Sequence, residues 1–134
     1  YPEAEAKNLF VRDDKKRNYY LITVRGDKRL DLKAFRKTFG LRALSFASPA
    51  DLEDKLQLIP GSVSPFGLLN DNSCSVTWFI DEEFSNISHM IGIHPNDNTA
   101  TVWLNPQDLM QIISDHGTTI KMIDLNDCLI KEEI

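Results

Sequence analysis

Two β-rich runs separated by a short charged segment most constrain how this chain can fold. Residues 8–12 and 19–25 are rich in aliphatic and aromatic side chains, whereas residues 13–17 are all charged. Runs of this length and composition on either side of a polar turn predict an antiparallel β-hairpin. The fold is therefore expected to be built on a sheet that begins near the start of the chain.

Capping signals predict three short helices. An aspartate opens the segment 31–40 and a glycine ends it, which is the usual arrangement of an N-cap and a C-cap. A Ser-Pro pair begins the segment 48–56, and an Asn-Pro pair begins the segment 105–117, which also ends on glycine. The apolar side chains expected to face the core are Leu32, Phe35, Phe39, Leu52, Leu56, Leu109, Ile112 and Ile113.

The remaining β-rich segments complete a sheet. Further strands are predicted at residues 43–47, 75–80, 89–93, 99–104 and 119–123, with a short helix or loop at 81–88. Alternation in the second of these places Val76 and Trp78 on one face. No internal repeat or linker divides the chain. The fold class expected is mixed α/β (α+β), with a curved, mostly antiparallel sheet or partial barrel flanked by short helices.

Composition narrows the class of protein. The chain has 134 residues with 42% hydrophobic and 26% charged residues, as in a globular domain, and no apolar stretch approaches the ~20 residues of a membrane helix. Cys74 and Cys128 form no CxxC pair, so reduced thiols are expected, with a disulfide as the alternative. Because the first strand follows Tyr1 almost at once, an N-terminal piece is expected to be absent.

Charge is distributed unevenly along the chain. Residues 1–42 contain 12 of the 15 Lys and Arg but 6 of the 20 Asp and Glu, so they carry a formal charge of +6, and residues 43–134 carry −11. This division favours one phosphate-attracting surface on an otherwise acidic body. The alternative is a solvated hairpin and helix that happen to be rich in lysine.

The histidines do not form a metal site by spacing. Common nucleotide-binding, zinc-protease and serine-hydrolase motifs are also missing from the sequence. His94 near Asp97 leaves zinc binding as an open alternative. His116 is expected at the C-terminus of a helix, where the helix dipole favours it. His89 is expected to be structural, or exposed at the start of a strand.

Three segments carry candidate functional residues. Lys7 and Asn8 head the first strand, where a long amine is well placed to meet an anion in a cleft. The loop 61–67 contains two glycines and a proline, so its backbone N–H groups can point at a carbonyl oxygen; the alternative is a plain helix-to-strand connection. His94, followed by Pro95, can aim its imidazole into the mouth of the sheet or hydrogen bond at its rim.

Six segments, in this order, resemble the YbaK/ProX family of aminoacyl-tRNA deacylases, which is related to the editing domain inserted in bacterial prolyl-tRNA synthetase. The segments are residues 7–10, 13–16, 26–33, 44–48, 61–68 and 94–102. The sequences of these segments are most similar to those of the free-standing ProX branch, which clears alanine from tRNA for proline. The resemblance implies that residues 1–134 are a single editing domain that lacks the helix and strand preceding the family's lysine.

The resemblance also implies roles for individual residues. Lys7 matches the family's essential lysine, which would bind the terminal phosphate or ester end of the charged tRNA, and Gly61 begins the GxxxP loop whose backbone would hold the ester carbonyl. These two are the expected catalytic residues. The expected substrate-binding residues are Asn8, Ser62, Val63, Ser64, Pro65 and His94, of which the histidine would limit side-chain size.

The function implied is hydrolysis of mischarged tRNA, with Ala-tRNA(Pro) as the expected substrate. The family uses no metal, no other cofactor and no protein nucleophile, and the vicinal ribose hydroxyl of the substrate would help to activate water. The expected partners are the 3′ end of aminoacylated tRNA and prolyl-tRNA synthetase, with no membrane or DNA, in the cytoplasm. The alternatives are a Cys-tRNA(Pro) deacylase, a non-catalytic tRNA-binding or regulatory module, and a protein–protein module on a synthetase.

Overall fold

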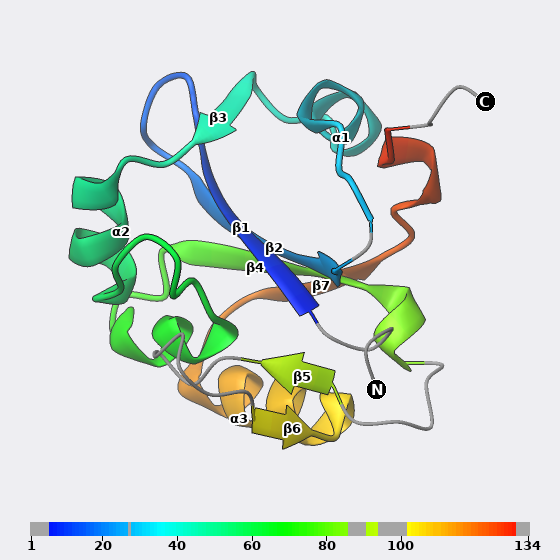
Figure 1. The fold of residues 1–134 in the computed structure, drawn as a ribbon. Coiled ribbons are helices and arrows are strands. Elements are labelled where there is room, and N and C mark those ends of the chain that lie inside the picture. Colours follow the sequence, from blue (N-terminus) through cyan, green and yellow to red (C-terminus); the bar gives the residue numbers. More distant parts are fainter. Residues whose placement is uncertain (1–5, 27, 86–90, 94–101, 131–134) are drawn as a thin grey trace.

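The computed structural model describes residues 6–26, 28–85, 91–93 and 102–130, and its centre is a five-stranded sheet (Figure 1). The sheet has the order β3-β1-β2-β4-β7. Its strands are β1 (Ala6–Asp13), β2 (Tyr19–Arg25), β3 (Leu44–Phe46), β4 (Val76–Asp81) and β7 (Ile120–Ile123). A separate pair is formed by β5 (Ile91–Ile93) and β6 (Val102–Leu104).

The main sheet is mixed, with one antiparallel half and one parallel half. The predicted hairpin is present, since β1 pairs antiparallel with β2, and β1 also pairs antiparallel with β3. In contrast, β4 runs parallel to β2 and to β7. Parallel neighbours need a long crossover connection, which helices supply between β2 and β4 and again between β4 and β7. The mixed α/β class is confirmed, and the sheet remains open.

The three predicted helices form where their caps are. They are α1 (Leu32–Phe39), α2 (Pro49–Leu56) and α3 (Pro106–His116), with N-caps Asp31, Ser48 and Asn105. Short 3₁₀ helices add η2 (Pro65–Asn70), η3 (Glu82–Ser85) and η4 (Asn126–Cys128). His116 ends α3 as expected. Each cap satisfies backbone N–H groups that a helix end would otherwise leave unpaired.

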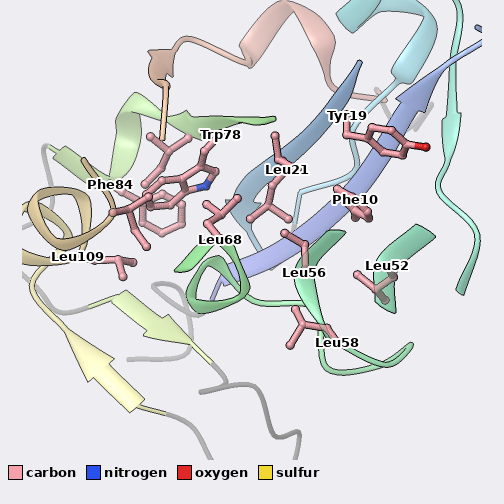
Figure 2. Close-up of a cluster of buried hydrophobic side chains, with 13 residues drawn as sticks. Phe10, Tyr19, Leu21, Leu52, Leu56, Leu58, Leu68, Trp78, Phe84 and Leu109 are labelled. Atoms are coloured by element: carbon pink, nitrogen blue, oxygen red, sulfur yellow. The ribbon is translucent and has the colours of Figure 1, made fainter. Parts of the chain in front are cut away.

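Helices cover both faces of the sheet, so the described part of the chain has two hydrophobic cores. On one face, α1 and η4 pack around a cluster containing Phe35, Phe79 and Cys128. On the other face, α2, η2 and α3 cover a larger cluster centred on Trp78, which Figure 2 shows beside Phe84. Val76 and Trp78 share this face, as the alternation predicts.

Two expectations about single residues have different outcomes. Ile112 is 47% exposed, so its predicted place in the apolar stripe of α3 is wrong; Leu109 and Ile113 alone face the core from that stripe. Cys74 and Cys128 are both free thiols, as expected. None of the helices in the described part of the chain has the length and apolar character needed to span a bilayer.

Candidate functional site

A cavity of about 240 Å³ lies where the first half of β1 meets the start of α2 and the loop before η2. Its wall is mostly apolar, and Asn8 from β1 and Gly61 from the loop both contribute to it. The full set of lining residues is Asn8, Leu9, Phe10, Phe46, Ala47, Pro49, Leu52, Pro60, Gly61 and Val63. A concave apolar wall with a few polar groups is the usual form of a small-molecule site.

The loop before η2 keeps several backbone donors unpaired. Gly61 has φ of +90°, a conformation that side chains rarely adopt, and it turns the chain after Pro60. The Ser62 N–H donates to the Ile59 carbonyl over 3.1 Å. Among the described residues, the N–H groups of Gly61, Val63 and Ser64 have no hydrogen-bond partner. Such donors can bind a carbonyl oxygen or an anion.

The serines of this loop serve its fold. Ser64 is fully buried, and its hydroxyl accepts the Phe66 N–H over 3.1 Å as the N-cap of η2. Ser62 is 2% exposed, and Pro65 is buried in the first turn of η2. Their buried side chains therefore shape the loop, and none of these three predicted substrate-binding residues is among those that line the cavity.

Asn8 is held by a chain of two hydrogen bonds across three strands. The indole Nε1–H of Trp78 donates to Oγ1 of Thr23 over 2.8 Å, and the Thr23 hydroxyl donates to Oδ1 of Asn8 over 2.6 Å. Asn8 and Thr23 are directly paired in the β1–β2 register. Thr23 and Trp78 are both fully buried, so these bonds are shielded from water.

Lys7 precedes Asn8 on β1, but its side chain leaves the opposite face of the strand. Successive side chains of a strand leave opposite faces, and the Lys7 ammonium donates to the backbone carbonyl of Lys28 in the β2–α1 connection. Lys7 is not among the residues that line the Asn8 cavity. Lys28 in turn forms an ion pair with Asp81 at 2.9 Å and another with Glu83.

A network of charged and polar side chains around Asp51 connects α2, which forms part of the cavity wall, to β1 and β2. Burial alone would raise the pKa of Asp51, but hydrogen bonds from Ser48 and Tyr19, together with the nearby Arg12 guanidinium, outweigh it and lower that pKa. Asp51 also completes a capping box with Ser48, and its carboxylate lies 3.5 Å from Arg12. The helix that carries Pro49 and Leu52 is thereby fixed against β1 at neutral pH.

The structure thus brings some of the predicted site residues together. Asn8, Gly61 and Val63 meet at one cavity, whereas the Lys7 ammonium is directed to Lys28. His94 and Asp97 lie outside the described residues. No group of three or more His, Cys, Asp or Glu side chains in the described part of the chain is arranged to hold a metal ion.

Sequence reasoning missed Thr23 and Phe46 as parts of the site. Thr23 is the one polar residue between Leu21 and Val24 in a strand that is otherwise apolar there, which is a usable signal. Phe46 lines the cavity and is 62% exposed, so it forms part of the rim. Its position depends on the pairing of β3 with β1, which no local pattern reveals.

Comparison with known proteins identifies the family. The model of the family described as "Aminoacyl-tRNA editing domain" matches residues 1–112. The chain belongs to this family. The membership confirms the predicted resemblance and makes the chain an aminoacyl-tRNA deacylase.

Individual relatives agree with this placement. The chain is 44% identical over 119 residues to the Prolyl-tRNA editing protein ProX of Acetoanaerobium sticklandii, covering 89% of this chain and 72% of that protein. It is 33% identical over 117 residues to Prolyl-tRNA synthetase associated domain-containing protein 1 of Bos taurus, covering 85% and 68% of the two chains.

Solved structures show the same fold at low identity. A candidate trans-editing enzyme for prolyl-tRNA synthetase superposes with a TM-score of 0.71 at 21% identity, covering 98% of this chain and 73% of that one. A scaffold protein used for epitope grafting superposes with a TM-score of 0.74 at 20% identity, covering 100% and 75%. These likenesses support the fold alone.

Proposed function

We propose that this chain hydrolyses the ester of mischarged tRNA, with Ala-tRNA(Pro) as its substrate. The observation that carries the proposal is the meeting of Asn8 with the Gly61 loop at one small cavity, in a member of the aminoacyl-tRNA editing family. The 44% identity to a prolyl-tRNA editing protein favours tRNA for proline as the carrier. The aminoacyl group would occupy the cavity, with the 3′ end of the tRNA at its mouth.

The proposed hydrolysis requires that the attacking water be positioned and that the ester carbonyl be polarised. The unpaired N–H groups of Gly61 and Val63 would donate hydrogen bonds to the ester carbonyl oxygen and stabilise the oxyanion that forms as water adds to the carbonyl carbon. The bond from that carbon to the ribose oxygen then breaks, and the ribose oxygen takes up a proton, releasing alanine and free tRNA. The vicinal ribose hydroxyl would orient the attacking water, so no protein nucleophile or metal is required.

The cavity wall favours alanine over hydroxylated amino acids. Phe10, Leu52 and Val63 present apolar surface that suits a methyl group. A serine hydroxyl placed against such a wall would lose its hydrogen bonds to water without gaining others. Size selection by a second site is needed because a synthetase discriminates a missing methylene by only ~1–3 kcal/mol.

Lys7 is proposed to bind the terminal phosphate of the tRNA. Its bond to a backbone carbonyl is replaceable, since an ammonium has three donors and a flexible stem, and the partner is neutral. An anion entering beside β1 would offer a charge-assisted contact in its place.

The test is deacylation of Ala-tRNA(Pro) by the full chain and by Lys7→Ala. We expect turnover by the wild type and a loss of about a hundredfold in the variant. Lys15→Ala is the matched control, because Lys15 is an exposed lysine in the turn at the opposite end of β1. If the wild-type chain binds the tRNA in a salt-dependent way but leaves the ester intact, a non-catalytic tRNA-binding module is the correct reading.

A further inference from the structure

In the Trp78–Thr23–Asn8 chain of hydrogen bonds, the donor of each bond can be assigned, and this assignment fixes the orientation of the Asn8 amide at the cavity. The indole nitrogen of Trp78 is a donor only, so it occupies a lone pair of the Thr23 oxygen. The threonine hydroxyl has a single proton to give. Thr23 is fully buried, and among the described residues Asn8 is the acceptor within reach of that proton.

It follows which way the Asn8 amide is turned. An asparagine side chain presents an oxygen at one end and an NH₂ group at the other, and either end can face a neighbour. A reversed amide would put NH₂ against the Thr23 oxygen and leave the buried hydroxyl proton without an acceptor, which is costly in the protein interior. Oδ1 therefore faces Thr23, and the two N–H donors of Nδ2 point away from it.

Those donors are free to serve a ligand. Nδ2 of Asn8 donates to none of the described residues, and Asn8 lines the cavity together with Gly61 and Val63. The Asn8 NH₂ group can only donate hydrogen bonds, and it shares the cavity with a loop of backbone N–H groups. Such a cavity suits a ligand that is rich in acceptor oxygens. An aminoacyl ester with its ribose is such a ligand.

We infer that Thr23 and Trp78 are positioning residues that hold the Asn8 amide with its N–H donors toward the substrate's ester or ribose oxygens. The inference rests on the proposed deacylase function and deepens it, since it assigns the polarity of one wall of the same site. The indole N–H of Trp78, which lies amid an apolar cluster (Figure 2), and the buried hydroxyl of Thr23 then have a role beyond their hydrogen bond to each other.

Its test is a set of variants assayed for single-turnover deacylation of Ala-tRNA(Pro) at saturating protein. Thr23→Val keeps the shape of the side chain but removes the hydroxyl, and we expect the rate to fall about tenfold to a hundredfold, the range seen when residues that orient metal ligands are removed. Thr23→Ser keeps the hydroxyl and is expected to retain a rate near that of the wild type. A purely steric role for Thr23 would give the opposite order, since serine loses the methyl and valine does not.

Two further variants separate positioning from structure. In an Asn8→Ala background, Thr23→Val is expected to have no further effect on the rate, because Thr23 acts through Asn8. Asn8→Asp can still accept the Thr23 proton but has no N–H to donate, so it is expected to fold normally and be as slow as Asn8→Ala. This second variant keeps the inference testable even if Thr23→Val does not fold.

The outcomes distinguish the inference from the proposed function. If the wild-type chain leaves Ala-tRNA(Pro) intact, both fall. If the wild type is active but Asn8→Asp is equally active, or Thr23→Val slows the Asn8→Ala protein further, the positioning role is overturned while the deacylase function stands.

Discussion

At Gly61 the backbone adopts φ of +90°, so the conformation of a single residue sets the direction of the N–H groups that follow it. An added Cβ is strained at positive φ, at a cost of about 1 kcal/mol or more. We expect Gly61→Ala to lower the deacylation rate by tenfold or more, because the loop would relax and its donors would turn away from the cavity.

Gly40 provides the matched control for this substitution. It has φ of +66° at the C-cap of α1, and a Cβ built there meets no atom within 4 Å. Gly40→Ala should therefore lower the urea midpoint of unfolding by a similar amount without slowing deacylation. Equal losses of activity in the two variants would mean that Gly61 acts on stability alone.

Among the elements, the β1–β2 hairpin depends on the carboxylate that closes its turn. Asp13 accepts the Arg17 N–H over 2.9 Å and the Asn18 amide over 2.8 Å. Burial tends to raise the pKa of Asp13, but these hydrogen bonds outweigh it, so its pKa lies below the usual 3.8. The charged form is thus bound more favourably in the folded chain than in the unfolded one.

This gives a prediction for acid stability. A carboxyl whose pKa is depressed on folding contributes stability above its unfolded pKa, and that contribution is lost as the pH falls below about 4. Asp13→Ala should lower the urea midpoint at pH 7, and the difference from the wild type should shrink as the pH is lowered toward 2. A difference that stays constant over this range would exclude the carboxylate as its source.

Local elements of the fold were predictable from the sequence, whereas long-range strand pairing was not. The three helices were predictable because their caps are local: Asp31, Ser48 and Asn105 each bond to an N–H two or three residues later. The parallel placement of β4 beside β2 was not predictable, since it joins residues over fifty positions apart. The site divides in the same way, because the Gly61 turn is local, whereas the contact of Asn8 with Thr23 requires the β1–β2 register.

For the molecule as a whole, the division of charge along the chain is partly compensated inside the fold. Basic residues of the first 42 positions pair with acidic residues from the rest of the chain, as Arg12 does with Asp51 and Arg25 with Glu83. These pairs join β1 to α2 and β2 to η3. Part of the asymmetry therefore serves to hold distant segments together.

Lys28 is the centre of the most shielded of these pairings. Its side chain is 12% exposed and pairs with Asp81, which is 4% exposed, while its own carbonyl accepts the Lys7 ammonium. Burial would lower the pKa of Lys28, but the hydrogen bonds and charges of Glu83 and Asp81 outweigh it and raise that pKa. The contribution of Lys28 to stability is thus complete below pH 10.5 and is lost as the pH rises through its folded pKa.

Lys28→Met should accordingly weaken the fold. Because the pair is neither fully exposed nor fully buried, we expect a loss of about 2 kcal/mol in the free energy of unfolding at pH 7, between the values for surface and buried pairs. Lys28→Arg should restore most of the stability. A loss of stability that Lys28→Arg does not restore would show that the ion pairs with Asp81 and Glu83 are not its source.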